Sequence, residues 1–459
     1  MLCFRCFRSN TEKVEGEEKR REVSASPAAA SVPSTISTGE RSNLTFSTAS
    51  SAVGTSVSEG SSAVVRPASG SVSSARSIPE QYEERGANSL RRFGFRELRA
   101  ATSDFSRLLK LGEGGFGSVY KGVVRLPGGP AVGTVVAIKK LNPNGHQGHK
   151  QWLAEVHFLG VVEHPNLVKL IGYCADQSKR GPQRLLVYEF MANKTLDDHL
   201  FNKAYPVLPW DIRLEVALGA AEGLLYLHEG LEVQVIYRDF KASNILLDEE
   251  FRAKLSDFGL AREGPSAGHT HVSTAVMGTL GYAAPDYVET GHLTTKSDVW
   301  SFGVVLYEIL TGRRSMDRKR PKNEQKLLEW VRLYPAESKQ FSKIIDTRLE
   351  GHYSKQGTRK IAKLANSCLA KHRRDRPAMR EVVESLKQVM QHKELDADGG
   401  ASAESSPPNE VSRKPTTEDV AVASARRRML HLAALGENAN SIARRRFMLM
   451  RAAAAPTLS

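Results

Sequence analysis

Dense apolar periodicity in this chain is confined to one long segment, residues 93–392, which sets the size of its folded part. The segment before it, residues 1–92, is rich in Ser, Ala and Gly and has few large apolar side chains. Residues 393–459 form a polar linker followed by an Arg-rich tail. Because so little apolar surface cannot offset the entropy of ordering a chain, we expect disordered terminal regions around one folded domain.

The composition narrows the class of protein. Of the 459 residues, 40% are hydrophobic and 25% are charged, which suits an ordinary globular enzyme. Four scattered cysteines are too few for a disulfide framework and indicate a reducing, intracellular compartment. No run approaches the roughly 20 apolar residues of a membrane span. The net charge of +14 lies partly in the tail and accompanies no nucleic-acid-binding motif, so no nucleic acid is expected as a partner.

The stretch VIYRDFKASNILLD, residues 235–248, places charged groups just before a short aliphatic run. The run, residues 245–247, is typical of a buried strand, whereas Asp239 and Lys241 ordinarily face water. The two requirements meet at the edge of a cleft. The charges therefore form either a solvated turn or a reaction centre.

A glycine-rich turn occurs in LLKLGEGGFGSVYKGVV, between two expected strands. Gly112, Gly114 and Gly117 allow a backbone loop to approach phosphate oxygens, because no Cβ intervenes. Taken alone, the spacing fits a plain hairpin turn equally well. A dinucleotide-binding fingerprint is excluded, since Val119 and Tyr120 continue as strand residues and no helix follows.

Two further charged residues lie where apolar ones surround them. Lys139 belongs to the expected strand TVVAIKKL, and Glu155 lies in KQWLAEVHFLGVV, whose apolar residues recur at helical spacing. A buried lysine is unfavourable unless a carboxylate meets it, so we expect Glu155 to reach Lys139. The alternative is a surface lysine and a solvated glutamate.

The segment AKLSDFGLAR supplies one more carboxylate, Asp257, and the set then fits phosphoryl transfer. That reaction requires a positioned hydroxyl and neutralised phosphate charge. Asp239 is predicted to accept the hydroxyl proton and Lys241 to stabilise the transferring group. Asn244 and Asp257 are predicted to bind the metal ion. We therefore expect a catalytic loop in residues 235–248.

These motifs, in this order, resemble those of eukaryotic protein kinases over roughly residues 105–390. The resemblance implies an α+β, bilobal fold, with a small β-rich N-lobe at about residues 105–191, carrying one helix, and a larger α-helical C-lobe at about residues 192–392. It also implies Lys139, Glu155, Asp239 and Lys241 as catalytic residues. The cofactors implied are ATP and Mg²⁺, with Mn²⁺ as an alternative.

The segments FRELRAATSDFS, YRDFKASNILLD, HVSTAVMGTLGYAAP and EQKLLEW more narrowly resemble plant receptor-like cytoplasmic kinases of subfamily VII. That family implies serine/threonine specificity, protein substrates, upstream cell-surface receptor kinases and a role in defence signalling. Lys241 and Thr279 fit this specificity, because tyrosine kinases typically have an Arg in place of that lysine. A pseudokinase scaffold is the alternative.

The resemblance also assigns the nucleotide-binding residues. Tyr188 matches the gatekeeper position, so the next residues would offer backbone groups to the adenine. The ATP-binding residues implied are Leu111, Gly112, Glu113, Gly114, Gly115, Phe116, Gly117, Ser118, Val119, Lys139, Glu189 and Met191.

Regulation by phosphorylation is expected from Arg238, whose guanidinium can bind a phosphate bidentately. By resemblance, Ser273 and Thr274 are the best-placed acceptors, and Thr279 is a third candidate that better fits the substrate pocket. The alternative is that these are solvated loop hydroxyls.

Two residues depart from the kinase pattern. Tyr237 replaces a histidine that packs and does not react, which leaves the predicted activity intact. Asp286 replaces the glutamate of Ala-Pro-Glu, which by family analogy pairs with Arg376. Because aspartate is one methylene shorter, we expect a stretched or lost ion pair, and this departure keeps the pseudokinase alternative open.

The chain ends suggest where the protein is found. Leu2 stands where N-myristoylation needs glycine, but Cys3 and Cys6 lie among aromatic and basic residues and are candidates for acylation. Two acyl chains near anionic headgroups would suffice for stable anchoring. Two free thiols are the alternative. We expect the cytoplasm or the cytoplasmic face of the plasma membrane, with the basic tail as a possible nuclear signal.

Overall fold

The computed structural model describes residues 76–86, 90–114, 117–142, 146–178, 181–266 and 268–397. The chain divides into two compact units, and all of these residues belong to the unit made of residues 1–9 and 75–459. The expected disorder of residues 1–75 and 398–459 and the acylation of Cys3 and Cys6 lie outside the described residues. Within the described ranges, no helix has the length and apolar content to cross a membrane.

One face of the unit is a six-stranded sheet in the order β1-β5-β8-β4-β3-β2, antiparallel except between β1 and β5. Its strands are β1 (Arg91–Arg92), β2 (Lys110–Gly114), β3 (Gly117–Val124), β4 (Thr134–Leu141), β5 (Leu170–Cys174) and β8 (Leu185–Glu189). A separate short hairpin joins β6 (Gln177–Ser178) to β7 (Gly181–Pro182). Side chains alternate along β4, so Val136 and Ile138 enter a hydrophobic core while Ala137 and Lys139 line a cavity on the other face. The predicted β-rich lobe is confirmed.

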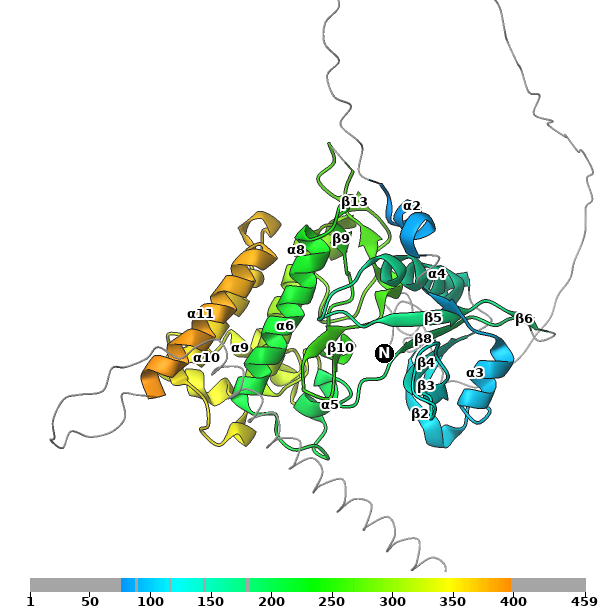
Figure 1. The fold of residues 1–459 in the computed structure, drawn as a ribbon. Coiled ribbons are helices and arrows are strands. Elements are labelled where there is room, and N and C mark those ends of the chain that lie inside the picture. Colours follow the sequence, from blue (N-terminus) through cyan, green and yellow to red (C-terminus); the bar gives the residue numbers. More distant parts are fainter. Residues whose placement is uncertain are drawn as a thin grey trace, which may run out of the picture. The chain divides into compact units, whose positions relative to one another are not determined.

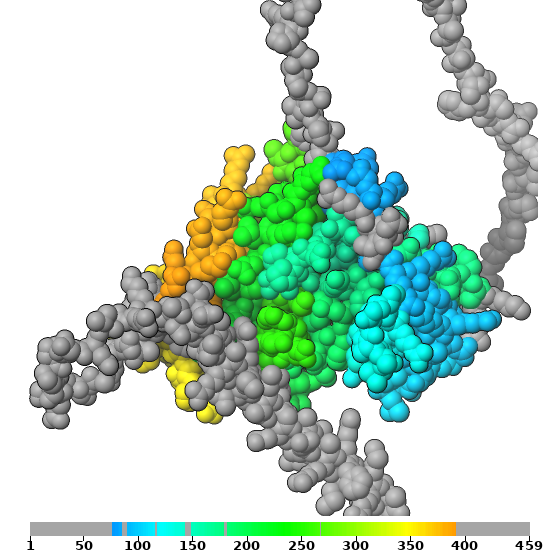
Figure 2. Space-filling model, viewed as in Figure 1, coloured from blue at the N-terminus to red at the C-terminus, as the bar shows by residue number. Residues whose placement is uncertain are grey.

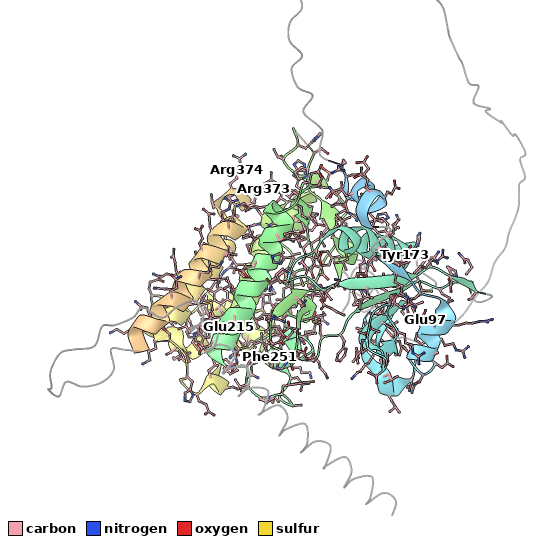
Figure 3. The ribbon with its side chains drawn as sticks, viewed as in Figure 1. Glu97, Tyr173, Glu215, Phe251, Arg373 and Arg374 are labelled. Atoms are coloured by element: carbon pink, nitrogen blue, oxygen red, sulfur yellow. The ribbon has the colours of Figure 1, made fainter. Side chains whose placement is uncertain are left out.

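Helices precede and pack around this sheet (Figure 1). They are α2 (Ile78–Gln81), η1 (Tyr82–Gly86), α3 (Phe95–Ala101), η2 (Arg107–Leu109) and α4 (His146–Val161). Within the described part of residues 105–191, α4 is the one α-helix, as expected, and η2 is a short 3₁₀ turn. Residues 393–397, expected to be disordered, continue helix α11 (Met379–Ala397). The expected disorder is also wrong for residues 76–86 and 90–92. These residues are ordered because Ile78 and Leu90, although isolated in a polar stretch, are buried in the hydrophobic core, and that burial stabilises the segment. On the sheet edge, Tyr173 of β5, labelled in Figure 3, pairs with Arg92 of β1.

The remaining described residues form the helical lobe. Its helices are α5 (Leu196–Phe201), α6 (Trp210–Glu229), η3 (Ala242–Asn244), η4 (Phe258–Leu260), α7 (Pro285–Thr290), α8 (Thr295–Thr311), η5 (Lys322–Glu324), α9 (Leu327–Val331), η6 (Phe341–Ile344), η7 (Thr347–Leu349), α10 (Lys355–Cys368), η8 (Arg373–Asp375) and α11 (Met379–Ala397). Helix α8 is buried on all sides from Ser297 to Thr311. A helix that is apolar all round belongs in the centre of a lobe, and α6, α9 and α10 pack against α8.

Short strands bring the charged motifs to one edge of the helical lobe. Strands β10 (Ile245–Leu247) and β11 (Ala253–Leu255) form an antiparallel hairpin, and β9 (Val235–Ile236) pairs with β12 (Arg262–Glu263). Strand β13 (Val272–Ser273) pairs with β14 (His292–Leu293). Ile245 and Leu247 are buried, as the sequence predicts. The loop before β10 and the turn after β11 therefore lie side by side next to the sheet.

Candidate active site

A cavity of about 510 Å³ lies between the sheet and the helical lobe. Its lining contains most of the residues that the sequence assigns to nucleotide binding and catalysis: Leu111, Gly112, Glu113, Gly114, Gly117, Val119, Lys139, Glu155, Glu189, Met191, Asp239, Lys241, Asn244, Asp257 and Thr279. Ser118 is described but does not line it, because its place in the pleat turns it away from its lining neighbours Gly117 and Val119. Gly115 and Phe116 lie outside the described residues.

The glycines of the β2–β3 hairpin serve different purposes. A Cβ added at Gly112 or Gly114 would meet no atom within 4 Å, so these positions leave open space beside the cavity. Gly117 has φ +154°, and a Cβ there would lie 2.1 Å from the carbonyl oxygen of Lys140. Only glycine fits this close approach of β3 to β4. Gly117 therefore allows the close contact between β3 and β4, while Gly112 and Gly114 leave the space beside the cavity open.

Lys139 joins the sheet to two carboxylates. Its Nζ lies 2.6 Å from Glu155 Oε1 on α4 and 2.8 Å from Asp257 Oδ1 after β11. Tyr188 donates a hydrogen bond to Glu155 Oε2, a contact that sequence analysis does not predict. The expected pairing of Lys139 with Glu155 is confirmed, and Glu155 is fully buried.

The electrostatics keep Lys139 and Asp257 ionised, whereas burial raises the pKa of Glu155. Burial lowers the pKa of Lys139, but Asp257 and Glu155 more than offset it, so the pKa of Lys139 is raised. Burial raises the pKa of Asp257, but the Lys139 ammonium outweighs burial and the pKa of Asp257 is lowered. At neutral pH the cavity therefore holds the Lys139 ammonium beside the Asp257 carboxylate, as a site for a charged phosphate and a cation requires.

A second cluster surrounds Asp239. Lys241 Nζ lies 2.5 Å from Asp239 Oδ2, and Thr279 donates a 2.6 Å hydrogen bond to Asp239 Oδ1. Lys241 Nζ also donates to Thr279 Oγ1 at 2.9 Å. Asn244 donates through Nδ2 to the Asp239 carbonyl oxygen at 3.0 Å. All four side chains meet at the cavity, so an acceptor for a proton lies beside a fixed positive charge.

Asp298 of α8 holds the loop that carries this cluster. It accepts the backbone N–H groups of Tyr237 at 2.8 Å and Arg238 at 2.7 Å, and lies 2.8 Å from His228 Nε2. Arg238 has φ +74°, a strained conformation for a non-glycine residue. Sequence reasoning did not single out Asp298, which lies in the segment KSDVWSFGVVLYEILTG, residues 296–312. Asp298 and Glu308 are the two acids of this mostly apolar helix, and such acids are the signal that could have found Asp298.

Arg238 also contacts the segment that follows Asp257. Its guanidinium donates to Tyr287 OH, to the carbonyl oxygen of Ala275 and, at 3.3 Å, to Thr274 Oγ1. Among the described residues its buried NH1 group has no hydrogen-bond partner. Ser273 lies on β13 and is exposed. The structure therefore brings Thr274 to Arg238 directly.

The ion pair of Asp286 differs from expectation. Arg376 NH2 lies 2.5 Å from Asp286 Oδ1, so the pair is direct and the predicted stretching or loss is wrong. Arg376 also donates to the carbonyl oxygens of Ala370 and Lys296. These backbone partners fix the guanidinium where the shorter carboxylate reaches it. Asp286 thus gives no support to the pseudokinase alternative.

The described residues fit a nucleotide with a divalent cation. Apolar Val119, Ala137, Val168 and Leu246 line the cavity, which suits a flat aromatic base. Asp257 and Asn244 supply a carboxylate and an amide, the hard donors that Mg²⁺ and Mn²⁺ prefer. No group of three or more His, Cys, Asp or Glu side chains that could hold a metal occurs in the described ranges.

Comparison with known proteins shows that the sequence is similar to protein kinases. Residues 105–386 match the protein tyrosine and serine/threonine kinase family. Serine/threonine-protein kinase PCRK1 of Arabidopsis thaliana is 56% identical over 305 residues, 66% of this chain and 73% of that protein. Probable serine/threonine-protein kinase PBL20 of the same plant is 56% identical over 334 residues, 71% and 84% of the two chains. Receptor-like cytoplasmic kinase 176 of Oryza sativa subsp. japonica is 49% identical over 364 residues, 77% and 91%.

Proposed function

This chain belongs to the protein kinase family, as a serine/threonine kinase of the receptor-like cytoplasmic type, and from that premise we propose how its residues transfer the γ-phosphate of ATP to protein hydroxyls. The observation that supports the proposal most is the meeting of two clusters in one cavity. Lys139, Glu155 and Asp257 form the first, and Asp239 with Lys241 belongs to the second.

Asp239 acts as the base in this proposal. It takes the proton of the substrate hydroxyl as the hydroxyl oxygen bonds to the γ-phosphorus and the bond to the β-phosphate oxygen breaks, which releases ADP. Lys241 stabilises the negative charge on the transferring group, and its contact with Asp239 holds the two side chains together at the reaction centre. Thr279, in contact with both, orients them toward the substrate.

Nucleotide binding is assigned to the hairpin and to the strand at the back of the cavity. Residues 111–119 cover the phosphates, Lys139 binds them, and Glu155 holds Lys139. The backbone of Glu189 and Met191 meets the adenine edge. Kinases of this family use ATP with a divalent metal, and we assign Mg²⁺, or Mn²⁺ in its place, to Asn244 and Asp257. Bound there, the cation neutralises phosphate charge.

The partners and location are further parts of the proposal. The resemblance to subfamily VII supports upstream cell-surface receptor kinases, protein substrates and a role in defence signalling. Acylation of Cys3 and Cys6 would attach the protein to the cytoplasmic face of the plasma membrane, with the cytoplasm and nucleus as other locations. Fractionation of cells that express Cys3→Ser/Cys6→Ser tests this, since an unchanged membrane fraction would remove the acylation proposal.

The assignment of Lys139 and Asp257 is tested by autophosphorylation of purified variants. We expect Lys139→Met and Asp257→Ala to lower the rate by roughly 10²–10³-fold or more, because each removes charge stabilisation from the transition state. The exposed Lys355→Met is the matched control and should retain the wild-type rate. A wild-type rate in either site variant would contradict the assigned roles.

A further inference from the structure

The residues just before the family match form a segment that packs on the helix carrying Glu155. We call residues 76–86 and 90–92 the N-terminal strap. Its Ile78 is 1% exposed and lies in one hydrophobic core with Trp152 and Val156 of α4. Figure 1 shows α2 of the strap beside α4, and in Figure 2 its blue atoms lie against the blue-green and green atoms of the domain.

The closest fit between strap and helix is at Tyr82. A Cβ added at Gly160, in α4, would lie 2.6 Å from two carbons of the Tyr82 ring. Glycine is unfavourable inside a helix, and here it makes room for the ring. The same ring packs on His157, with ring centroids 5.1 Å apart. The Tyr82 ring therefore occupies a notch in α4 that exists only because residue 160 is glycine, since any side chain there would fill it.

The strap also contacts the helical lobe. The Ile78 N–H donates a 2.8 Å hydrogen bond to Glu263 Oε1 on β12, six residues after Asp257. Arg76 binds Glu232, after α6, through its backbone N–H at 3.0 Å and its guanidinium at 3.2 Å. The strap thus contacts three parts of the domain: helix α4, strand β12 after Asp257, and the loop that follows α6.

From these contacts we propose that the strap is a positioning element for the active site, with Tyr82 as its main positioning residue. It holds α4 so that Glu155 stays within 2.6 Å of Lys139, and it ties that helix to the segment after Asp257. Loss of the strap frees α4 to move away from the sheet, and Lys139 then loses the carboxylate of Glu155. The proposal rests on the proposed kinase function and adds a residue that lies outside the family match.

The first test measures kcat in the full chain. We expect Tyr82→Ala to lower kcat about tenfold, which corresponds to about 1.4 kcal/mol. Tyr82→Phe, which keeps the ring in its notch, should retain activity, as should the exposed control Glu83→Gln. In a Glu155→Gln background, Tyr82→Ala should cause no further loss, because the strap acts through Glu155. An equal loss in both backgrounds, or no loss in either, would overturn the proposal.

A paired substitution tests the contact itself. Gly160→Ala alone should displace the Tyr82 ring and lower kcat, whereas in the Tyr82→Ala background the added methyl group fills the vacated space and should cause no further loss. Additive losses would show that the two residues do not act as one contact, which contradicts the inference.

Hydrogen exchange separates this proposal from the kinase function, because it needs no turnover. In Tyr82→Ala the amides of residues 146–161 and 258–263 should exchange faster, while those of α8 keep their wild-type rates. Unchanged exchange in α4 would overturn the strap proposal even in an active kinase. If exchange in α4 is faster in Tyr82→Ala but the wild-type protein has no kinase activity, the strap proposal is supported and the proposed function is refuted.

Discussion

At the scale of single residues, the chemistry of this protein depends on charges held in pairs. Lys139 lies between two carboxylates, and Asp239 lies between an ammonium and a hydroxyl. Each pair satisfies groups that would be unfavourable alone in a cavity with apolar walls. Two other carboxylates, the half-buried Asp286 and the buried Glu308, lie outside the cavity lining and affect stability.

Asp286 should behave as a fully effective partner of Arg376. Asp286→Ala is expected to lower the free energy of unfolding by about 3 kcal/mol, because a buried guanidinium loses its counter-charge. Asp286→Glu should bring no gain, since the pair is already direct. Melting temperatures of the three proteins without ATP decide this. A glutamate variant that melts several degrees higher would show that the aspartate pair is weak.

Glu308 should make stability depend on pH. Burial raises its pKa to about 8, while Tyr282 and the Ser315 N–H bind one of its oxygens. Between the unfolded pKa, near 4.5, and 8, only the folded state holds this proton, so rising pH lowers stability by up to about 1.4 kcal/mol per unit. Glu308→Gln should therefore gain stability over wild type from pH 5 to pH 8 in urea unfolding. The exposed control Glu384→Gln should not, and a constant difference for Glu308→Gln would contradict the shift.

At the scale of elements, the hairpin β10–β11 and helix α8 position the residues that we propose as catalytic. The hairpin sets Asn244 beside the segment of Asp257, through hydrogen bonds from Ser256 to the Asn244 carbonyl oxygen. Helix α8 supplies Asp298, which fixes the loop before the hairpin. The loop is thus anchored at both ends on buried structure, which keeps its strained backbone in place.

The segment after Asp257 should be switched by phosphate on Thr274. A phosphate there gains charge-assisted hydrogen bonds from Arg238, whose NH1 lacks a partner among the described residues. We expect Thr274→Ala to lose most of the kinase activity with an unchanged melting temperature, and Thr274→Ser to retain it. Ser273→Ala should lose less, because Ser273 is exposed. Initial rates of peptide phosphorylation measure this, and a wild-type rate in Thr274→Ala would exclude the switch.

At the scale of the whole molecule, the sequence predicted the two lobes and the residues that meet between them. The residue types in motifs such as those of Lys139 and Asp257 indicate phosphate and metal binding, so the order of these motifs along the chain predicted the candidate active site. The strap escaped prediction because Ile78 and Tyr82 are isolated apolar residues in a polar stretch, with no period to mark them. Ile78 and Tyr82 contribute to the fold only by packing on α4, and such a tertiary contact leaves no local pattern in the sequence. Likewise, no local pattern reveals that Arg376 is positioned for a shorter acid.

The most direct test of the account is transfer of labelled γ-phosphate by purified full-length protein, compared with Asp239→Asn. The asparagine keeps the shape of the side chain but cannot take the proton, so we expect a fall of roughly 10²–10⁴-fold with unchanged ATP affinity. Wild-type protein should place phosphate on serine and threonine in the presence of Mg²⁺. Transfer by Asp239→Asn at the wild-type rate, or an inactive wild type, would contradict the account.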